Sequence, residues 1–421
     1  MRFFKWLSPG LGIKRWIFLC LSGLGLVVIF ALLTVKSISR ESVLLASVTM
    51  ASLIFGIFLI YMGIKNMVRI FVRALMPLDR RDSELVDIVF QSQQSHTLLK
   101  GPRVVAIGGG TGLSAMLSGI KKYTSNITAI VTVTDTGGSS GRLRDEMDIL
   151  PPGDIRNCLV SLADAGPLIR DLFQYRFEVG EGLKGHSFGN LFITALSKVT
   201  GDFEKAIAES SKVLNIRGRV LPSTLEKVSL VAEFSDGTWA EGETNITDIK
   251  KNIVGLKLKP ADCRACAEAV DAILNADIIL MGPGSLYTSI LPNLLIPEIQ
   301  KSILKSDAYK IYVMNVMTQP GETINYSASD HLDVLTRHTD PRIVDGCFVN
   351  TRPVPPDLLK KYAEQGAGLV DMDLDKIEAK GYEILKGAVI TTDGQVRHDS
   401  EKLCQILIEH AAARLGAGAS K

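Results

Sequence analysis

Two long apolar runs near the start of the chain predict a pair of membrane-spanning helices. Residues 16–35 and 43–64 contain no charged side chain, and each run can cross a hydrocarbon core of about 30 Å as a helix. Because only residues 36–42 separate them, residues 1–64 form the predicted membrane anchor. A cleaved signal peptide is the alternative, but a second apolar run follows at once and no small-residue cleavage site is present.

Basic residues predict the orientation of this anchor. Basic side chains are in excess outside the two runs, at Arg2, Lys5, Lys14 and Arg15 before the first and Lys65, Arg69, Arg73, Arg80 and Arg81 after the second. The short connection carries Lys36 and Arg40. The bias predicts a two-pass protein of the plasma (inner) membrane, with both termini and the soluble domain in the cytoplasm.

Residues 65–102 are predicted to join the anchor to a soluble domain at residues 103–421. The first part, residues 65–78, interleaves basic with apolar side chains, which suits a helix lying on the membrane surface or one that only extends the second span. The last part, residues 91–102, is polar and contains Lys-Gly-Pro, which is typical of a linker.

Beyond residue 103, short apolar runs alternate with amphipathic helical stretches. Strands are expected at residues 104–107, 127–134, 277–281, 310–316 and 342–349, and helices between them include residues 113–123 and 191–199. The alternation predicts an α/β fold with a Rossmann-like, doubly wound, mostly parallel sheet. One antiparallel hairpin is expected as well, because residues 227–234 and 238–242 flank an Asp236-Gly237 turn.

A glycine-rich turn follows the first strand and opens a helix. Glycines let backbone N–H groups approach an anion, and the helix N-terminus adds partial positive charge. We therefore expect a phosphate cradle at Gly109, Gly110, Thr111 and Gly112. Asp135, at the end of the next strand, could reach a ribose hydroxyl. A tight strand-to-helix turn without a ligand is the alternative.

The loop that begins at Asp135 combines glycines, hydroxyls and two arginines. Such donors and permanent cations suit a diphosphate, and they are Gly138, Ser139, Ser140, Arg142 and Arg144. A solvated surface loop is the alternative, but this combination at the carboxyl end of a strand favours a ligand.

Two further polar stretches precede predicted helices. In residues 151–157, Asp154 has a simple interpretation as a helix N-cap, while Arg156 and Asn157 could face the cleft. In residues 185–190, His186 and Asn190 are candidates for contacts with a sugar. His186 is also a candidate acid–base group, with a structural imidazole as the alternative.

The predicted strand at 277–281 ends in a second glycine turn. Its glycines could admit a phosphate, its hydroxyls could donate to it and its tyrosine ring could pack on a base or sugar; these residues are Gly282, Gly284, Ser285, Tyr287 and Thr288. Residues 315–323 close a third strand with amides and hydroxyls. Because a doubly wound sheet gathers its strand ends at one edge, we expect these loops to converge.

Composition limits the class of ligand. A net charge of +2 with dispersed basic residues disfavours nucleic acid as a partner. Six cysteines in a chain whose bulk is cytoplasmic favour free thiols. Cys263 and Cys266 are interpreted as two small residues on one helical face, since a zinc site would want a second pair at suitable spacing.

Six motifs occur in order between about Arg103 and Arg397-His398: VVAIGGGTGLS, GGSSGRLR, PPGD, GHSFGN, GPGSLYTS and NVMTQ. In these the chain resembles the CofD-like superfamily, most closely its bacterial YvcK-like branch of gluconeogenesis factors. The resemblance implies a Rossmann-like domain that binds nucleotide-linked ligands such as UDP-sugars. It also implies a role in cell shape and envelope (peptidoglycan) synthesis during growth on gluconeogenic carbon sources. Catalysis is not implied for this branch, although archaeal and actinobacterial relatives transfer a phospholactyl group to a deazaflavin.

The chain departs from the family pattern in two places. Many relatives have two adjacent aspartates before Gly-Gly-Ser-Ser, whereas this chain has Asp135-Thr136, which weakens a metal-assisted reaction. Many relatives are also wholly soluble, so the predicted anchor would hold this domain beside the membrane.

Three functions are therefore considered. The first is a membrane-tethered nucleotide-sugar sensor that acts on an envelope-synthesis protein and needs no obligatory cofactor. The second is a 2-phospho-L-lactate transferase in which Asp135 binds magnesium and His186 assists proton transfer. The third, an NAD-dependent oxidoreductase, ranks last because no substrate domain or catalytic tyrosine–lysine pair is evident. The sequence leaves the oligomeric state open, a homo-oligomer included.

Overall fold

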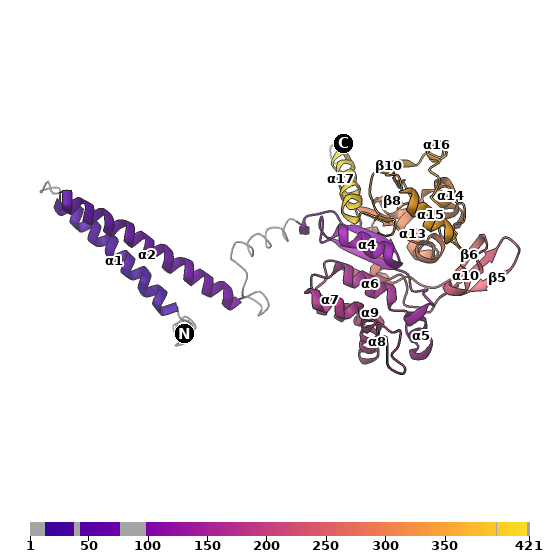
Figure 1. The fold of residues 1–421 in the computed structure, drawn as a ribbon, viewed down its shortest axis with the longest axis horizontal. Coiled ribbons are helices and arrows are strands. Elements are labelled where there is room, and N and C mark those ends of the chain that lie inside the picture. The colour runs from indigo at the N-terminus through magenta and orange to yellow at the C-terminus, as the bar shows by residue number, and fades with distance from the viewer. Residues whose placement is uncertain (1–12, 38–42, 76–97, 393, 419–421) are drawn as a thin grey trace. The chain divides into compact units, whose positions relative to one another are not determined.

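The computed structural model describes residues 13–37, 43–75, 98–392 and 394–418, in two compact units, Met1–Gln94 and Ser95–Lys421 (Figure 1). Residues 91–97 of the predicted linker (residues 91–102) lie outside the described residues. From Leu98 onward the chain already belongs to the second unit, because this side chain is buried and its carbonyl accepts the Ser125 N–H at 3.0 Å.

The first unit is a pair of packed helices, α1 (Ile13–Ser37) and α2 (Val43–Leu75). Small residues allow a close approach, since a Cβ placed on Gly23 would lie 2.6 Å from the Gly56 carbonyl oxygen. Within them, Arg15–Thr34 and Ser47–Val68 are long and apolar enough to cross a membrane. The basic stretch after residue 64 extends α2 as far as Leu75.

The second unit is built on a seven-stranded parallel sheet in the order β10-β9-β8-β7-β1-β2-β3. Its strands are β1 (Val104–Gly108), β2 (Ile127–Val131), β3 (Arg219–Pro222), β7 (Ile278–Met281), β8 (Tyr309–Val313), β9 (Gly346–Asn350) and β10 (Glu383–Gly387). The predicted Rossmann-like fold is confirmed. The strand expected from residue 342 begins only at Gly346, because Asp340 caps a short 3-10 turn, η4 (Pro341–Ile343), through the Arg342 N–H at 2.8 Å.

Helices connect the strands and cover both faces of the sheet. They are α4 (Gly110–Ile120), α5 (Gly138–Met147), α6 (Gly153–Leu162), α7 (Pro167–Gln174), α8 (Phe188–Thr200), α9 (Phe203–Leu214), α10 (Glu243–Ile249), α11 (Ala267–Leu274), the π-helical turn η3 (Leu286–Ile290), α12 (Leu291–Leu294), α13 (Pro297–Lys305), α14 (Ala328–His338), α15 (Pro356–Glu364), α16 (Leu374–Ala379) and α17 (Ser400–Gly418). The steps β1 to β2 and β7 to β8 run in opposite directions along the sheet. Since parallel crossovers are right-handed, α4 and α13 lie on opposite faces, and the order reverses between β1 and β7.

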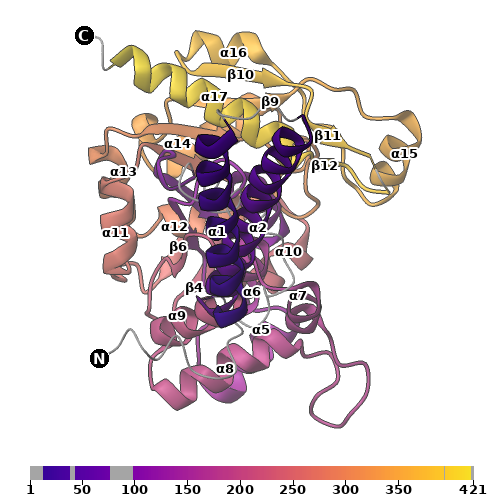
Figure 2. The same cartoon turned by 90° about the vertical axis from the view of Figure 1, so that its left-hand side faces the viewer.

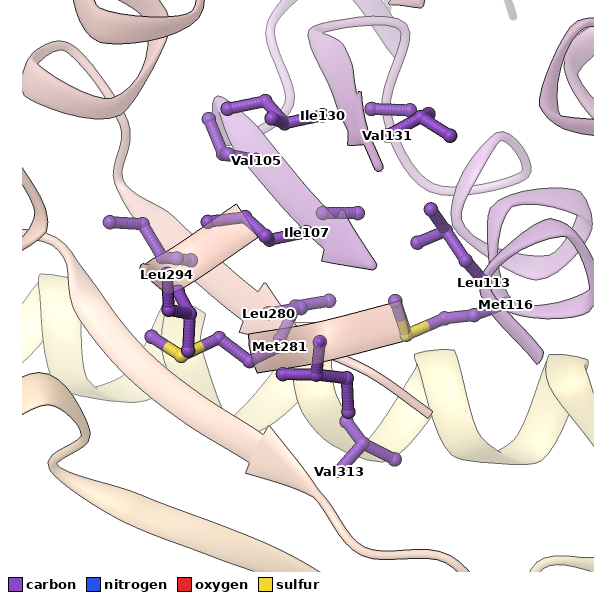
Figure 3. Packing of buried hydrophobic residues seen from close by; sticks show 14 of the residues in the cluster. Val105, Ile107, Leu113, Met116, Ile130, Val131, Leu280, Met281, Leu294 and Val313 are labelled. Carbon is purple, nitrogen blue, oxygen red and sulfur yellow. The ribbon is translucent and has the colours of Figure 1, made fainter. Parts of the chain in front are cut away.

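The central strands carry the core. Val105 and Ile107 of β1, Ile130 of β2 and Leu280 of β7 belong to one core cluster (Figure 3), and each is at most 2% exposed. Burial on both faces explains why these strands read as continuous apolar runs instead of alternating ones.

Two small sheets complete the unit. The predicted hairpin is confirmed as β4 (Ser229–Phe234) and β5 (Trp239–Glu241), to which β6 (Ile253–Lys259) adds a third antiparallel strand. Near the end of the chain, β11 (Ile390–Thr391) and β12 (Arg397–His398) form a short hairpin beside α15 (Figure 2). This hairpin and α15 share a small apolar cluster that includes Met317, Leu358 and Ile390.

Candidate functional site

A cavity of about 380 Å³ opens where the strand order reverses, between the turns that follow β1 and β7. Its walls include Gly109 to Gly112 from the first turn, Pro283 to Ser285 from the second and residues 315–320 after β8. The structure therefore brings together the three loops that sequence reasoning expected to converge. This crevice is where open α/β sheets bind their ligands.

The first glycine turn is shaped by its backbone. Gly110 has φ +63°, which favours glycine, and it opens α4. A Cβ on Gly112 would collide with the Pro283 carbonyl oxygen, so this glycine is required by the contact between the two turns. Thr111 and Gly112 lie in the first turn of α4, where backbone N–H groups have no helical acceptor and are the kind of donor that can bind an anion.

The second turn differs from expectation, because a buried carboxylate already occupies its donors. Glu322 accepts the Thr288 hydroxyl at 2.9 Å and the Tyr287 N–H at 3.1 Å, at the start of η3. Burial raises the pKa of Glu322, while these hydrogen bonds oppose the rise. Thr288 is therefore committed to Glu322 and has no free hydroxyl proton to donate to a phosphate.

The glycines of this turn support its shape. Gly282 has φ +81°, and Gly284 is held by Asn315, whose amide donates to the Gly284 carbonyl at 2.8 Å. Ser285 lines the cavity and its hydroxyl accepts Gln319 Nε2 at 2.7 Å. The Tyr287 ring is fully buried and its hydroxyl bonds Tyr326 at 2.8 Å, so it has no exposed face for a base.

The residues expected to address a sugar form a separate buried network. Ser139 Oγ lies 3.0 Å from His186 Nδ1 and accepts Asn190 Nδ2 at 3.1 Å, and all three side chains are buried. Burial lowers the pKa of His186, with nearby Arg142 adding to the effect. The network joins the start of α5 to the start of α8 and is not part of the described cavity wall.

The arginines expected to neutralise a diphosphate bind backbone carbonyls instead. Arg142 donates to Lys184 O at 3.0 Å and Arg144 to Val228 O at 2.8 Å. Arg156 donates to the Ser187 hydroxyl at 2.6 Å, at the start of α8. Gly138 has φ +49° at the start of α5, and the Ser140 side chain is buried against Gly153. These residues shape the loops around α5.

Carboxylates gather behind the first glycine turn. The N-cap interpretation of Asp154 is wrong, because Pro152 is the N-cap of α6 and Asp154 accepts a hydrogen bond from the Gly110 N–H. Burial, with Asp135 adding, raises the pKa of Asp154 to about 6. Burial and the charges of Asp135 and Asp154 likewise raise the pKa of Glu243 to about 9.

Asp135 itself accepts the Gly137 N–H at 2.8 Å. Across the part of the chain that the structure describes, no three His, Cys, Asp or Glu side chains are arranged to hold a metal ion. Cys263 and Cys266 are buried free thiols, but they do not share a helical face, because α11 begins only at Ala267 and Cys266 is its N-cap.

Sequence reasoning missed the outer wall of the cavity. Arg397 and His398 of β12 and Ser400 of α17 line it, and Arg397 is its one permanent charge among the described lining residues. Burial lowers the pKa of His398 to about 4, so this imidazole is neutral at pH 7. The strands of this hairpin have two residues each, too short for periodicity to reveal.

Comparison with known proteins agrees with this geometry. The family described as 2-phospho-L-lactate transferase CofD matches residues 104–390. The gluconeogenesis factor of Bacillus subtilis is 47% identical over 73% of this chain and 98% of its own. A relative in Clostridium acetobutylicum is 43% identical over 97% of this chain and 92% of its own.

A solved structure shows the same fold. The crystal structure of a Bacillus halodurans protein, 48% identical, superimposes with a TM-score of 0.72 over 73% of this chain and 100% of that one. Because that protein forms this fold by itself over a length equal to about three quarters of this chain, we expect the second unit to fold without the first. The chain belongs to the CofD family, among the relatives named gluconeogenesis factors.

Proposed function

We propose that the protein is a membrane-tethered regulator of cell shape and envelope synthesis that binds a nucleotide-sugar, such as a UDP-sugar, in the cavity between β1 and β7. The observation that carries the proposal is the meeting of the α4 N-terminus and Arg397 in that cavity. Backbone N–H groups at a helix start and a guanidinium both recognise phosphate oxygens.

The remaining walls suit the rest of such a ligand. Amide side chains at Gln319 and Gln395 can exchange hydrogen bonds with a base or a sugar, and Met317 with Tyr362 adds apolar surface. A volume of about 380 Å³ falls within the usual range for small-molecule sites. Arg397 donates to Gln395 Oε1 at 2.7 Å and remains exposed, so it is available to a diphosphate.

A regulatory role is favoured over catalysis by the placement of the candidate catalytic groups. His186 is enclosed with Ser139 and Asn190, and Asp135 accepts a backbone N–H. The second candidate, a 2-phospho-L-lactate transferase, rests on the family description. Asp135 and Asp154 offer it two neighbouring carboxylates, and magnesium in phosphate-transferring sites is commonly held by one or two carboxylates together with water and substrate phosphates.

Membrane anchoring is supported by the surface of the first unit. Large apolar side chains on α1 and α2 remain exposed, including Phe18, Leu32 and Ile54 at 69, 65 and 64%. The excess of basic residues outside the two runs supports a cytoplasmic second unit. An alkaline carbonate wash of cell membranes tests the anchor: the full chain stays with the membrane, whereas recovery in the wash contradicts it.

Ligand binding is tested on the unit Ser95–Lys421. Its melting temperature is recorded with UDP-sugars, GDP and NAD, with and without magnesium, and each mixture is then assayed for product. Because a ligand that binds only the folded state stabilises it by mass action, a UDP-sugar should raise the melting temperature without turnover. A magnesium-dependent shift with GDP and turnover of a phospholactyl donor supports the transferase instead.

A further inference from the structure

The helix α7 presents an apolar face to solvent. Leu168 and Leu172 share a face of α7 with exposures of 79 and 40%, and Tyr175, which follows the helix as its C-cap, is 52% exposed. The opposite side of α7 is well packed, since Phe173 is buried and its ring lies 5.0 Å from that of Phe192. The exposed face of α7 is therefore not needed for the packing of α7 within this unit.

This face lies near the point where the chain enters the second unit. The segment leading into α7 is bonded to the end of α4, because Lys121 Nζ donates to Ala163 O at 2.8 Å. A few residues further on, Asn126 donates to the carbonyl of Leu99 at 2.9 Å. The start of the unit and α7 lie on the same side of it (Figure 1), and Leu99 is itself an apolar side chain with 58% exposure.

The charge beside this face is positive. Burial lowers the pKa of Lys121 and the charge of Asp164 opposes the shift, whereas Arg170, Arg217 and Lys122 lower the pKa further, so these charges lie near one another. Arg217 and Lys122 are paired with Asp164 and Glu401. Lys121 donates to a carbonyl, and the one acidic side chain on α7 is Asp171. Anionic headgroups therefore complement this edge better than a neutral surface does.

We propose that this edge of the second unit, formed by Leu99, Leu168, Leu172 and Tyr175 with Lys121 and Arg170, rests on an anionic lipid surface. The inference rests on the proposed membrane anchor, and the described chain of the second unit begins at Leu98, next to Leu99 on this same edge. Apolar side chains would enter the headgroup region, the tyrosine would lie at the interface and the cations would meet lipid phosphates. Tethering favours this occupant, because it converts a weak contact into an intramolecular one.

The test uses the free unit Ser95–Lys421, in which Trp239 is replaced by phenylalanine and one new tryptophan is introduced. Leu172→Trp reports on the proposed face, and Val254→Trp, at an exposed position on β6, is the matched control. Fluorescence is recorded with vesicles of brominated phosphatidylcholine, with and without phosphatidylglycerol. Quenching of the tryptophan at 172 alone, and only with phosphatidylglycerol, is expected.

Two further variants test whether a loss of quenching reflects lipid docking or nucleotide binding. Arg170→Glu should weaken vesicle binding roughly fivefold or more, since each basic residue near an anionic surface contributes to adsorption. Leu168→Glu combined with Arg170→Glu should abolish quenching without changing the melting temperature or the nucleotide-induced shift. That last readout distinguishes a failure of lipid docking from a failure of nucleotide binding.

Three results would overturn the proposal. They are the absence of quenching at 172, equal quenching at 172 and 254, and quenching that survives in the variant that combines Leu168→Glu with Arg170→Glu. If Leu168→Glu instead lowers the sedimentation coefficient of the lipid-free unit, the face is a contact between copies of this chain.

Discussion

The backbone N–H of Gly110 donates a hydrogen bond to the carboxylate of Asp154, so the turn proposed to hold a phosphate is joined to a half-buried acid. A Cβ on Gly109 would lie 2.6 Å from Asp154 Oδ2, so the turn packs directly against this carboxylate. An anion bound at the turn would approach a carboxylate, and like charges at short range favour protonation of one of them.

Ligand affinity should therefore depend on pH through Asp154. Its pKa of about 6 would rise further when a phosphate binds, so a proton is taken up and affinity increases as pH falls through this value. Binding titrations of the ligand into the wild type and into Asp154→Asn, at a series of pH values from about 5 to about 8, check this prediction. A flat profile in wild type, or an equal slope in the variant, contradicts the role of Asp154.

The stability of the second unit should fall as pH rises because of Glu243. Its pKa is raised from 4.5 to about 9, so the native state retains a proton that the unfolded state releases between these values. Glu243→Gln removes this loss and should raise the free energy of unfolding at pH 8 by roughly 3–5 kcal/mol. Denaturant unfolding measures it, with Glu364→Gln, an exposed position on α15, as control. No difference between the two variants contradicts the prediction.

Gly112→Ala should disrupt both stability and binding. Its new Cβ meets the Pro283 carbonyl oxygen, and backbone atoms on both sides resist the displacement. We expect a loss of about 1–3 kcal/mol, as for other overpacked sites, together with the loss of any nucleotide-induced shift. Gly166→Ala is the control, because nothing lies within 4 Å of its Cβ position. If Gly112→Ala is as stable as this control, the two turns do not depend on their contact.

Glu322→Ala should destabilise the second turn strongly. It leaves the buried Thr288 hydroxyl and the Tyr287 N–H without an acceptor, at about 2–4 kcal/mol for the pair. Glu322→Gln, which keeps an acceptor oxygen, should lose less. Calorimetric melting of both variants decides, and equal losses would show that the charge matters more than the hydrogen bonds.

Much of the fold could be predicted from local pattern. Continuous apolar strands and glycine turns are set by neighbouring residues, so β1, β7 and the convergence of their turns followed from the sequence. What escaped prediction depends on distant partners. The sequence predicted that the Tyr287 ring stacks on a ligand, but its hydroxyl bonds Tyr326, which is distant in the chain. The hydrogen-bond donors of η3 bind Glu322, more than thirty residues away.

The same limit applies to charge. Arg142 and Arg144 suited a phosphate by composition, but loops remote in sequence supply the carbonyls that bind them. Arg397 carried no local signal, because its place at the cavity results from the packing of β11 and β12 on α15.

The central claim is that a nucleotide-sugar diphosphate lies between the α4 N-terminus and Arg397. Calorimetric titration of UDP-sugars into the unit Ser95–Lys421 and its Arg397→Ala variant tests it most directly, with Arg342→Ala, an exposed arginine on η4, as control. We predict wild-type binding, a loss of roughly 10- to 100-fold in the Arg397 variant with unchanged melting temperature, and no loss in the control. Absence of wild-type binding, or equal affinity in all three proteins, would contradict the account.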